Sequence, residues 1–283
     1  MVQLLITGVY GQLGRALERI ARHRGLAATG HDQDTLDIRD PGAVRECILR
    51  LAPETVINCA AYTAVDQCES DQDAAWAANA EAVGYLAEAC NQVGSRLVQI
   101  STDYVFSGDS HEPYAEADPT APLGVYGRSK LGGERLAKNA DRCLIVRTAW
   151  LYGHGGSNFV EAIRGQLMPG AAPLRVVTDQ VGSPTFCDDL ASAILDLDER
   201  SVTGIVHAVN AGATSWHGFA VEIARQLGIP VEIIPVTTAD LPRPAPRPAY
   251  SVLDTSLFTT LIGRRMSPWQ EALARYLAGP RGT

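Results

Sequence analysis

The chain has 283 residues, of which 46% are hydrophobic and 20% charged, so it is long enough to bury a full hydrophobic core. Its formal net charge of −8 at pH 7 and the lack of any Lys/Arg run argue against nucleic-acid binding, because a phosphate backbone needs a dense cationic surface. No apolar stretch approaches the ~20 residues that span a bilayer, and a glycine motif begins too early, at Gly8, to leave room for a signal peptide, so we expect a cytoplasmic protein without membrane contact.

Short β-rich runs and longer helical patterns alternate along the chain. The runs predict strands over residues 3–7, 26–30, 55–58, 96–101, 144–147, 174–178 and 204–209. The helical patterns cover residues 13–23, 41–51, 71–92, 126–137, 158–166, 187–197, 216–227 and 269–278. This alternation is typical of βαβ units. The sequence therefore predicts an α/β fold: a Rossmann-type doubly wound parallel sheet with a smaller C-terminal lobe.

A glycine motif, Gly8-Val9-Tyr10-Gly11-Gln12-Leu13-Gly14, lies between the first predicted strand and the first predicted helix. Glycines at such a turn let the backbone approach a pyrophosphate, and the helix N-terminus offers it N–H groups. We therefore expect a dinucleotide cofactor, although the spacing differs from the G-x-G-x-x-G of most dehydrogenases; a purely structural turn is the alternative. Residues 1–148 and 174–210 would then bind the cofactor, and residues 149–173 and 211–283 the substrate.

Asp32 follows the second predicted strand, where a carboxylate can accept a hydrogen bond from the adenosine ribose and repel a 2′-phosphate. No Arg or Lys is adjacent to it, which favours NADH over NADPH. The alternative is that Asp32 is one of several loop carboxylates, because Asp34 and Asp37 are close by.

Tyr126 and Lys130 are four residues apart in a predicted helix and so share one face. A ketone that accepts a hydride becomes an alkoxide and needs a positioned acid. Free tyrosine has a pKa near ~10, and a neighbouring ammonium would lower it. Chance occurrence on a helix surface is the alternative. However, Ser101-Thr102-Asp103 ends a predicted strand, at the edge where such sheets bind ligands, and the Thr102 hydroxyl could hold a carbonyl against the phenol.

Together these motifs resemble the extended short-chain dehydrogenases/reductases and, within them, the dTDP-4-dehydrorhamnose reductase family. The resemblance runs essentially end to end. The matching stretches are residues 8–14, 36–38, 58–69, 101–106, 122–130, 147–153, 179–185 and 246–248. The last three are the specific ones, because the wider superfamily shares only the first few.

The resemblance implies reduction of dTDP-4-dehydrorhamnose to dTDP-L-rhamnose with NADH or NADPH. It implies a catalytic triad of Thr102, Tyr126 and Lys130, and contacts from Thr102, Asp103 and Trp150 to the dTDP-sugar. Besides the glycines of the first turn and Asp32, the residues expected at the dinucleotide are Gln12, Leu13, Asp37, Ile38, Ala60, Ala61, Tyr62, Thr63, Tyr126 and Lys130.

Two aromatic or cationic residues have a second interpretation. Trp150 follows a strand and could offer a flat indole face to a sugar or base, or could simply pack in the core. Arg247, between two prolines that stiffen its loop, could clamp a diphosphate or lie in a solvated linker.

Several alternatives stay open. Sister enzymes reduce other dTDP-4-keto-deoxysugars, and a non-catalytic NADP-binding regulatory subunit, like that of methionine adenosyltransferase, resembles this fold; the intact triad argues against the latter. A nucleotide-sugar epimerase is disfavoured, since such enzymes lack the stretch at residues 179–185 and usually have a larger C-terminal domain.

The resemblance also bears on metal binding and oligomeric state. Some members of the family look like dimers that Mg²⁺ bridges through acidic residues. Ala16 stands where one of these acidic residues would be, so we predict no metal and a monomer or homodimer. The scattered cysteines are expected to be reduced thiols.

Overall fold

The computed structural model describes residues 2–167 and 172–279, and its main sheet has six parallel strands. These are β1 (Leu4–Thr7), β2 (Ala28–His31), β3 (Thr55–Asn58), β4 (Arg96–Thr102), β5 (Cys143–Thr148) and β10 (Gly204–His207). Their order is β10-β5-β4-β3-β1-β2. The chain leaves β1 toward β2 on one side and returns to β3 on the other, so a crevice opens beyond the carboxyl ends of β1 and β3. This confirms the predicted α/β class.

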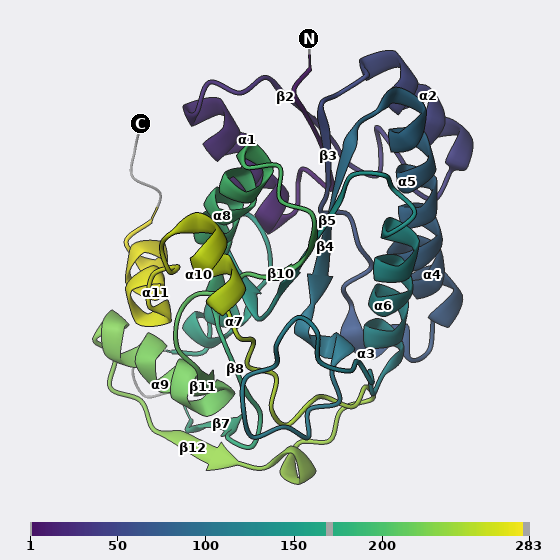
Figure 1. Cartoon of the computed structure of the whole chain (residues 1–283). Helices are drawn as coiled ribbons and strands as arrows, with labels where there is room; N and C mark the ends of the chain where they lie inside the picture. Colours follow the sequence, from purple (N-terminus) through teal and green to yellow (C-terminus); the bar gives the residue numbers. More distant parts are fainter. Residues whose placement is uncertain (1, 168–171, 280–283) are drawn as a thin grey trace.

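Helices cover both faces of this sheet (Figure 1). On one face lie α1 (Gln12–His23), α8 (Cys187–Glu199) and α10 (Ser256–Ile262). On the other lie α2 (Pro41–Leu51), α5 (Ala82–Val93) and α6 (Val125–Ala137). Strands covered on both faces must be apolar almost throughout, which explains their continuous hydrophobic runs.

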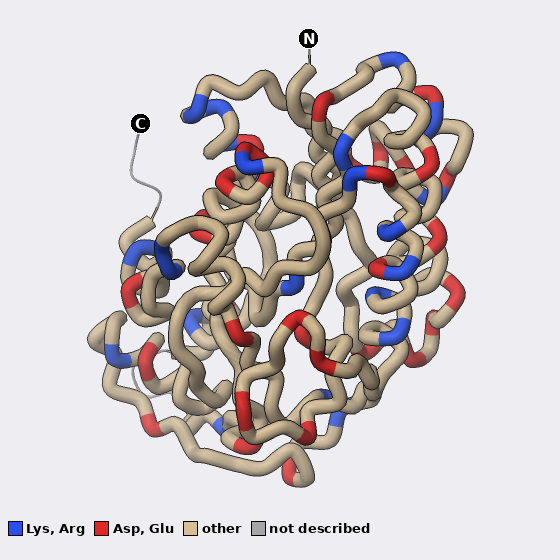
Figure 2. The backbone as a smooth tube through the Cα atoms, in the orientation of Figure 1, with Lys and Arg blue, Asp and Glu red and all other residues tan. Residues whose placement is uncertain are grey.

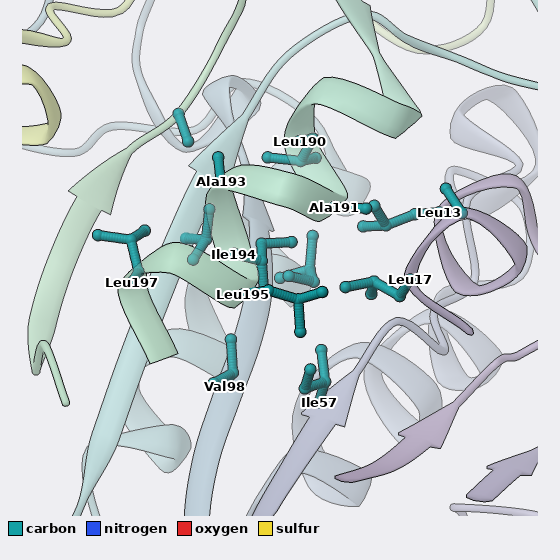
Figure 3. Close-up of a cluster of buried hydrophobic side chains, with 14 of the residues drawn as sticks. Leu13, Leu17, Ile57, Val98, Leu190, Ala191, Ala193, Ile194, Leu195 and Leu197 are labelled. Carbon is teal, nitrogen blue, oxygen red and sulfur yellow. The ribbon is translucent and has the colours of Figure 1, made fainter. Parts of the chain in front are cut away.

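The core between α1, α8 and the sheet holds the first turn in place. Figure 3 shows Leu13 and Leu17 of α1 facing Leu190 and Ile194 of α8 above the strands, and these side chains are at most 6% exposed. Each fully buried aliphatic side chain of this kind contributes roughly 1.5–3 kcal/mol. The helix that begins at the glycine turn is therefore anchored by its apolar face.

Local signals explain where most helices begin and end. Asp40 caps α2, since its Oδ1 accepts from the N–H groups of Gly42 (2.8 Å) and Ala43 (3.1 Å).

The helix predicted over residues 71–92 is continuous but not uniform. It consists of α4 (Gln72–Trp76), a π-helical turn at Ala77–Glu81, and α5. Such turns insert an extra residue and often occur at functional sites.

A smaller region packs against the end of the sheet. It contains α7 (Phe159–Arg164), α9 (Trp216–Leu227) and α11 (Trp269–Leu277) around an aromatic and aliphatic core. The short strands there are β6 (Leu151–Tyr152), β7 (Leu174–Val177), β8 (Val181–Gly182), β9 (Thr185–Phe186), β11 (Thr214–Ser215) and β12 (Ile233–Val236). In Figure 1 this region lies at the lower left.

The strand predicted at residues 174–178 is present but does not belong to the main sheet. Residues 174–177 form β7, but β7 pairs with β12 and lies outside the main sheet. The division into cofactor and substrate parts stays a proposal, with β7 now placed in the smaller lobe. Parts of the proposed ranges, at residues 1, 168–171 and 280–283, lie outside the described residues.

Charged residues of both signs are dispersed along the backbone (Figure 2). In the part of the chain that the structure describes, no helix combines the length and apolar character required for crossing a membrane.

Candidate active site

A cavity of about 900 Å³ lies at the carboxyl ends of β1, β3, β4 and β5. Ligands bind at this edge in open parallel sheets. The predicted site residues that line it are Gly8, Gly11, Gln12, Leu13, Gly14, Asp32, Asp37, Ile38, Ala60, Ala61, Tyr62, Thr63, Thr102, Asp103, Tyr126, Lys130 and Trp150. Arg247 is the one predicted site residue that does not line it. Segments far apart in sequence therefore meet in a single hollow.

The glycine turn is shaped for close approach. Gly8 has φ +65°, and a Cβ there would lie 2.8 Å from the backbone of Ala60. A Cβ on Gly14 would lie 2.3 Å from the carbonyl oxygen of Gly8. Gly11 is the N-cap of helix α1 and has no side chain to cap the first turn. The turn thus presents backbone and a helix N-terminus to the cavity, as a diphosphate requires.

Three charged residues, Asp32, Asp37 and Arg39, line the part of the cavity where we expect the adenosine ribose. Asp32 is engaged in its own turn, where Oδ1 accepts from the Thr35 hydroxyl at 2.9 Å. Arg39, which sequence reasoning did not select, also lines the cavity and forms a two-pronged ion pair with Asp37, with N–O distances of 2.9 and 2.7 Å. The hydrogen bonds from Arg39 lower the pKa of Asp37. A guanidinium therefore lies at this end of the cavity, although no Arg or Lys is adjacent to Asp32 in the sequence.

Lys130 is a buried residue of the cavity lining, and its ammonium is bound to the sheet. Its Nζ donates to the carbonyl oxygen of Ile100 at 2.7 Å. Burial lowers the pKa of Lys130 to about 8, while the Glu134 carboxylate one turn along α6 acts to raise it. Glu134 is itself paired with Arg147, with both N–O distances at 2.8 Å. The ammonium thus has a buried counter-charge within its own helix.

Tyr126 behaves differently from the sequence expectation. Burial raises the pKa of its phenol, the Asp103 carboxylate raises it further, and hydrogen bonding from Thr102 opposes both. Lys130 is not among the groups that lower the pKa of Tyr126 most, so the predicted lowering by the ammonium is not met within the protein itself. The phenol is consequently protonated at neutral pH.

A buried amide connects the π-helical turn to the site. Asn79, 1% exposed, accepts from the Tyr62 N–H at 2.8 Å and donates to the Tyr62 carbonyl oxygen at 3.0 Å. Its Nδ2 also donates to Ser129 Oγ at 3.0 Å, beside Lys130. The extra residue of the turn therefore fixes the segment after β3 against the helix that carries Tyr126 and Lys130.

Trp150 forms one wall in a constrained conformation. Its φ is +46°, which a non-glycine residue rarely adopts, and its indole stacks on Trp216 with ring centroids 3.5 Å apart. A Cβ on Gly182 would lie 2.6 Å from this indole. Both tryptophans line the cavity, so Trp150 packs against Trp216 and also faces the cavity, while its contact with a sugar or base stays a prediction.

Arg247 is held one layer behind the cavity. Its guanidinium donates to Asp66 at 3.0 Å and to the Ala245 carbonyl oxygen at 2.8 Å. Burial raises the pKa of Tyr104, which lines the cavity, and the Arg247 guanidinium acts to lower it. The Pro-rich loop is thus fastened to the N-terminal half of the chain rather than solvated.

Sequence reasoning missed several lining residues, among them Arg39, Tyr104, Thr148 and Trp216. Tyr104 lies within the Ser101–Phe106 motif and could have been included. Arg39 stands two residues after Asp37, close enough for the observed pair. Thr148 lies within the matching stretch at residues 147–153 and could also have been included. Trp216 carried no signal, because only the fold brings the start of α9 to the end of β5.

The chain also matches known proteins over nearly its whole length. It matches the family described as RmlD substrate binding domain over residues 2–281. It is 44% identical over 277 residues to the dTDP-4-dehydrorhamnose reductase of Streptomyces griseus, which covers 95% of this chain and 91% of that protein. It is 45% identical over 275 residues to a probable dTDP-4,6-dihydroxy-2-methyloxan-3-one 4-ketoreductase of Streptomyces antibioticus, with coverages of 95% and 92%.

A solved structure agrees with this. The dTDP-4-dehydrorhamnose reductase of Bacillus anthracis, in complex with NADP, is similar with a TM-score of 0.94 and 38% identity, covering 98% of this chain and 99% of that chain. The glycine turn of the present chain, where a Cβ on Gly8 or Gly14 would meet backbone atoms, leaves the close approach that a nicotinamide dinucleotide needs. The chain belongs to the RmlD family of extended short-chain dehydrogenases/reductases, and is an oxidoreductase of this family of dTDP-sugar 4-ketoreductases.

Proposed function

We propose that the chain reduces the 4-keto group of dTDP-4-dehydrorhamnose to dTDP-L-rhamnose, with Tyr126 as the proton donor. The observation that carries this proposal is the convergence of Thr102, Tyr126 and Lys130 with the glycine turn on one cavity. The free thiols of its cysteines agree with a cytoplasmic setting.

The cofactor would lie along the cavity from the adenosine end to Lys130. The backbone around Gly8, Gly11 and Gly14 would hold the diphosphate, and Lys130 would donate to the nicotinamide ribose. When bound, the reduced nicotinamide supplies a hydride. Asp37 can accept from a ribose hydroxyl, and Arg39 can pair with a 2′-phosphate, so we propose that both NADH and NADPH are used.

The residues around the sugar would supply the proton. The Thr102 hydroxyl would donate to the substrate carbonyl and hold it against Tyr126. The phenol, neutral because its pKa is raised, would protonate the oxygen as negative charge develops on it. The Lys130 ammonium would favour the resulting phenolate. Trp150 and Trp216 would form the wall beside the sugar or base.

A related dTDP-4-keto-deoxysugar is the alternative substrate, favoured by the similar identity to the Streptomyces antibioticus 4-ketoreductase. The test follows the loss of absorbance of NADH and, separately, NADPH with dTDP-4-dehydrorhamnose generated in situ. The proposal predicts that this sugar has the highest kcat/KM in a panel of dTDP-4-keto-deoxysugars and that NMR identifies dTDP-L-rhamnose. A higher kcat/KM for another sugar would reassign the substrate. Cofactor binding without oxidation of either cofactor would favour the regulatory-subunit alternative.

A further inference from the structure

One carboxyl group in the cavity has no part in the proton transfer described above. Asp103 is 2% exposed and lines the cavity, and its Oδ2 has no hydrogen-bond partner among the described residues. Its Oδ1 accepts from Thr102 Oγ1 at 2.9 Å. A buried carboxylate with one bare oxygen is costly unless it carries a proton or meets a ligand.

We propose that Asp103 stores the proton that each reduction consumes and passes it through Thr102 to Tyr126. This inference rests on the proposed ketone reduction and extends it from the proton donor to the origin of the proton. Asp103 acts through Thr102, and so its role is separate from holding the sugar.

The Thr102 hydroxyl carries a single hydrogen, and this fixes the direction of the chain. When Asp103 is ionised, that hydrogen is donated to Oδ1 and is unavailable to Tyr126 or the substrate. When Asp103 is protonated, its O–H can donate to Thr102 Oγ1, and the Thr102 hydrogen can turn toward the phenol. Thr102 and Tyr126 line the same cavity, and the Thr102 hydroxyl acts to lower the pKa of the phenol against the larger effect of burial.

The proton transfers balance. The Tyr126 O–H breaks as its proton bonds to the substrate alkoxide oxygen. The phenolate takes the Thr102 hydroxyl proton, and Thr102 takes the carboxyl proton of Asp103. The chain then holds a neutral Tyr126, a neutral Thr102 and an Asp103 carboxylate, which takes a proton from water before the next reduction.

The surroundings favour a stored proton. Burial raises the pKa of Asp103 to about 6, and the hydroxyls of Ser251 and Thr102 act to lower it. The titratable groups that Asp103 acts on are Tyr104 beside it and Tyr126 on α6; Lys130 lines the same cavity, and Asp66 of α3 (Val65–Cys68) and Arg247 of the Pro-rich loop act in turn on Tyr104. An anionic dTDP diphosphate entering the cavity would raise the pKa of Asp103 further.

The first experiment uses the protein alone. Infrared difference spectra recorded during a pH titration report the carbonyl stretch of a protonated carboxylic acid, and Asp103→Asn identifies the contribution of Asp103. We expect a band that disappears with a midpoint near pH 6 and is missing from the variant. A carboxyl that is already fully ionised at pH 5 would overturn the proposal.

The second experiment is kinetic. We expect Asp103→Asn, which keeps the shape of the side chain, to lower kcat by about 10²-fold, with KM for the sugar within about threefold. It should also lose the decline in kcat that the wild type shows as pH rises through the pKa of Asp103. In Ser251→Ala, which removes a hydroxyl that acts to lower the pKa of Asp103, this decline should move to higher pH, and Asp103→Glu should restore part of the rate.

An increased KM at unchanged kcat in Asp103→Asn would contradict the proposal and leave Asp103 as a substrate contact. If the wild type reduces none of the dTDP-4-keto-sugars, the proposed function fails instead. The infrared titration would still decide whether Asp103 carries a proton near neutral pH.

Discussion

Replacing Glu134 by Gln tests how the fold supports the site. Glu134 and Arg147 are 1% and 2% exposed, and their side chains meet through two contacts of 2.8 Å. Two unit charges about 4 Å apart interact by ~4 kcal/mol at an effective dielectric constant of ~20. Removing one partner of a buried pair typically costs about 3–5 kcal/mol, because the other charge stays buried. We expect Glu134→Gln to lower the free energy of unfolding by this amount.

The same substitution should change the titration of Lys130. Burial sets the pKa of Lys130 at about 8, and Glu134 acts to raise it. Without that carboxylate the pKa falls below about 8, so Lys130 loses its proton at lower pH. The high-pH limb of kcat should therefore move to lower pH.

Urea-induced unfolding monitored by circular dichroism, together with a pH–rate profile, measures both effects. The double variant Glu134→Gln/Arg147→Gln is the matched control, since it removes both charges. It should regain part of the lost stability. A loss below about 1 kcal/mol in the single variant, or an unmoved high-pH limb, would refute the reasoning.

Three further predictions concern the cavity itself. Tyr126→Phe should nearly abolish turnover while cofactor affinity, measured by calorimetry, stays unchanged; an unchanged rate would exclude this phenol as the donor. Arg39→Ala should lower the ratio of kcat/KM for NADPH to that for NADH by about tenfold, because the freed Asp37 carboxylate repels a 2′-phosphate, and an unaltered ratio would place the 2′-position elsewhere. Gly182→Ala should displace the Trp150 indole and raise KM for the sugar, whereas Gly84→Ala, where a Cβ meets only ordinary contacts, should not; equal kinetics in the two variants would contradict a sugar-facing Trp150.

The sequence correctly predicted the elements whose ends are set by neighbouring residues. Helices over residues 41–51 and 216–227 match α2 and α9, because Asp40 and Ser215 cap their first turns. The strand at residues 55–58 matches β3, which is wholly buried. By contrast, β2 begins two residues later than predicted, and its residues are only half-buried, so no sharp hydrophobic edge marks its start.

The remaining features depend on distant parts of the chain. The π-helical turn has no local signal in an alanine-rich helix, and Asn79 within it makes its contacts with Tyr62 and Ser129, which are distant in the sequence. The strand at residues 174–177 was recognised, but its partner β12 lies beyond α9, and a parallel strand pair leaves no local signature. In the site, the motifs indicated which residues gather, whereas their charge states follow from burial that only the fold reveals. The raised pKa of Tyr126 is the main example.

Isotope transfer tests the central claim most directly. The chain is incubated with dTDP-4-dehydrorhamnose and a reduced nicotinamide cofactor deuterated at the transferable position, and the product sugar is analysed by NMR. We predict dTDP-L-rhamnose with deuterium at C4 from the wild type and almost none from Tyr126→Phe. Deuterium at another carbon, or an unlabelled sugar with the cofactor intact, would contradict a 4-ketoreductase acting in this cavity.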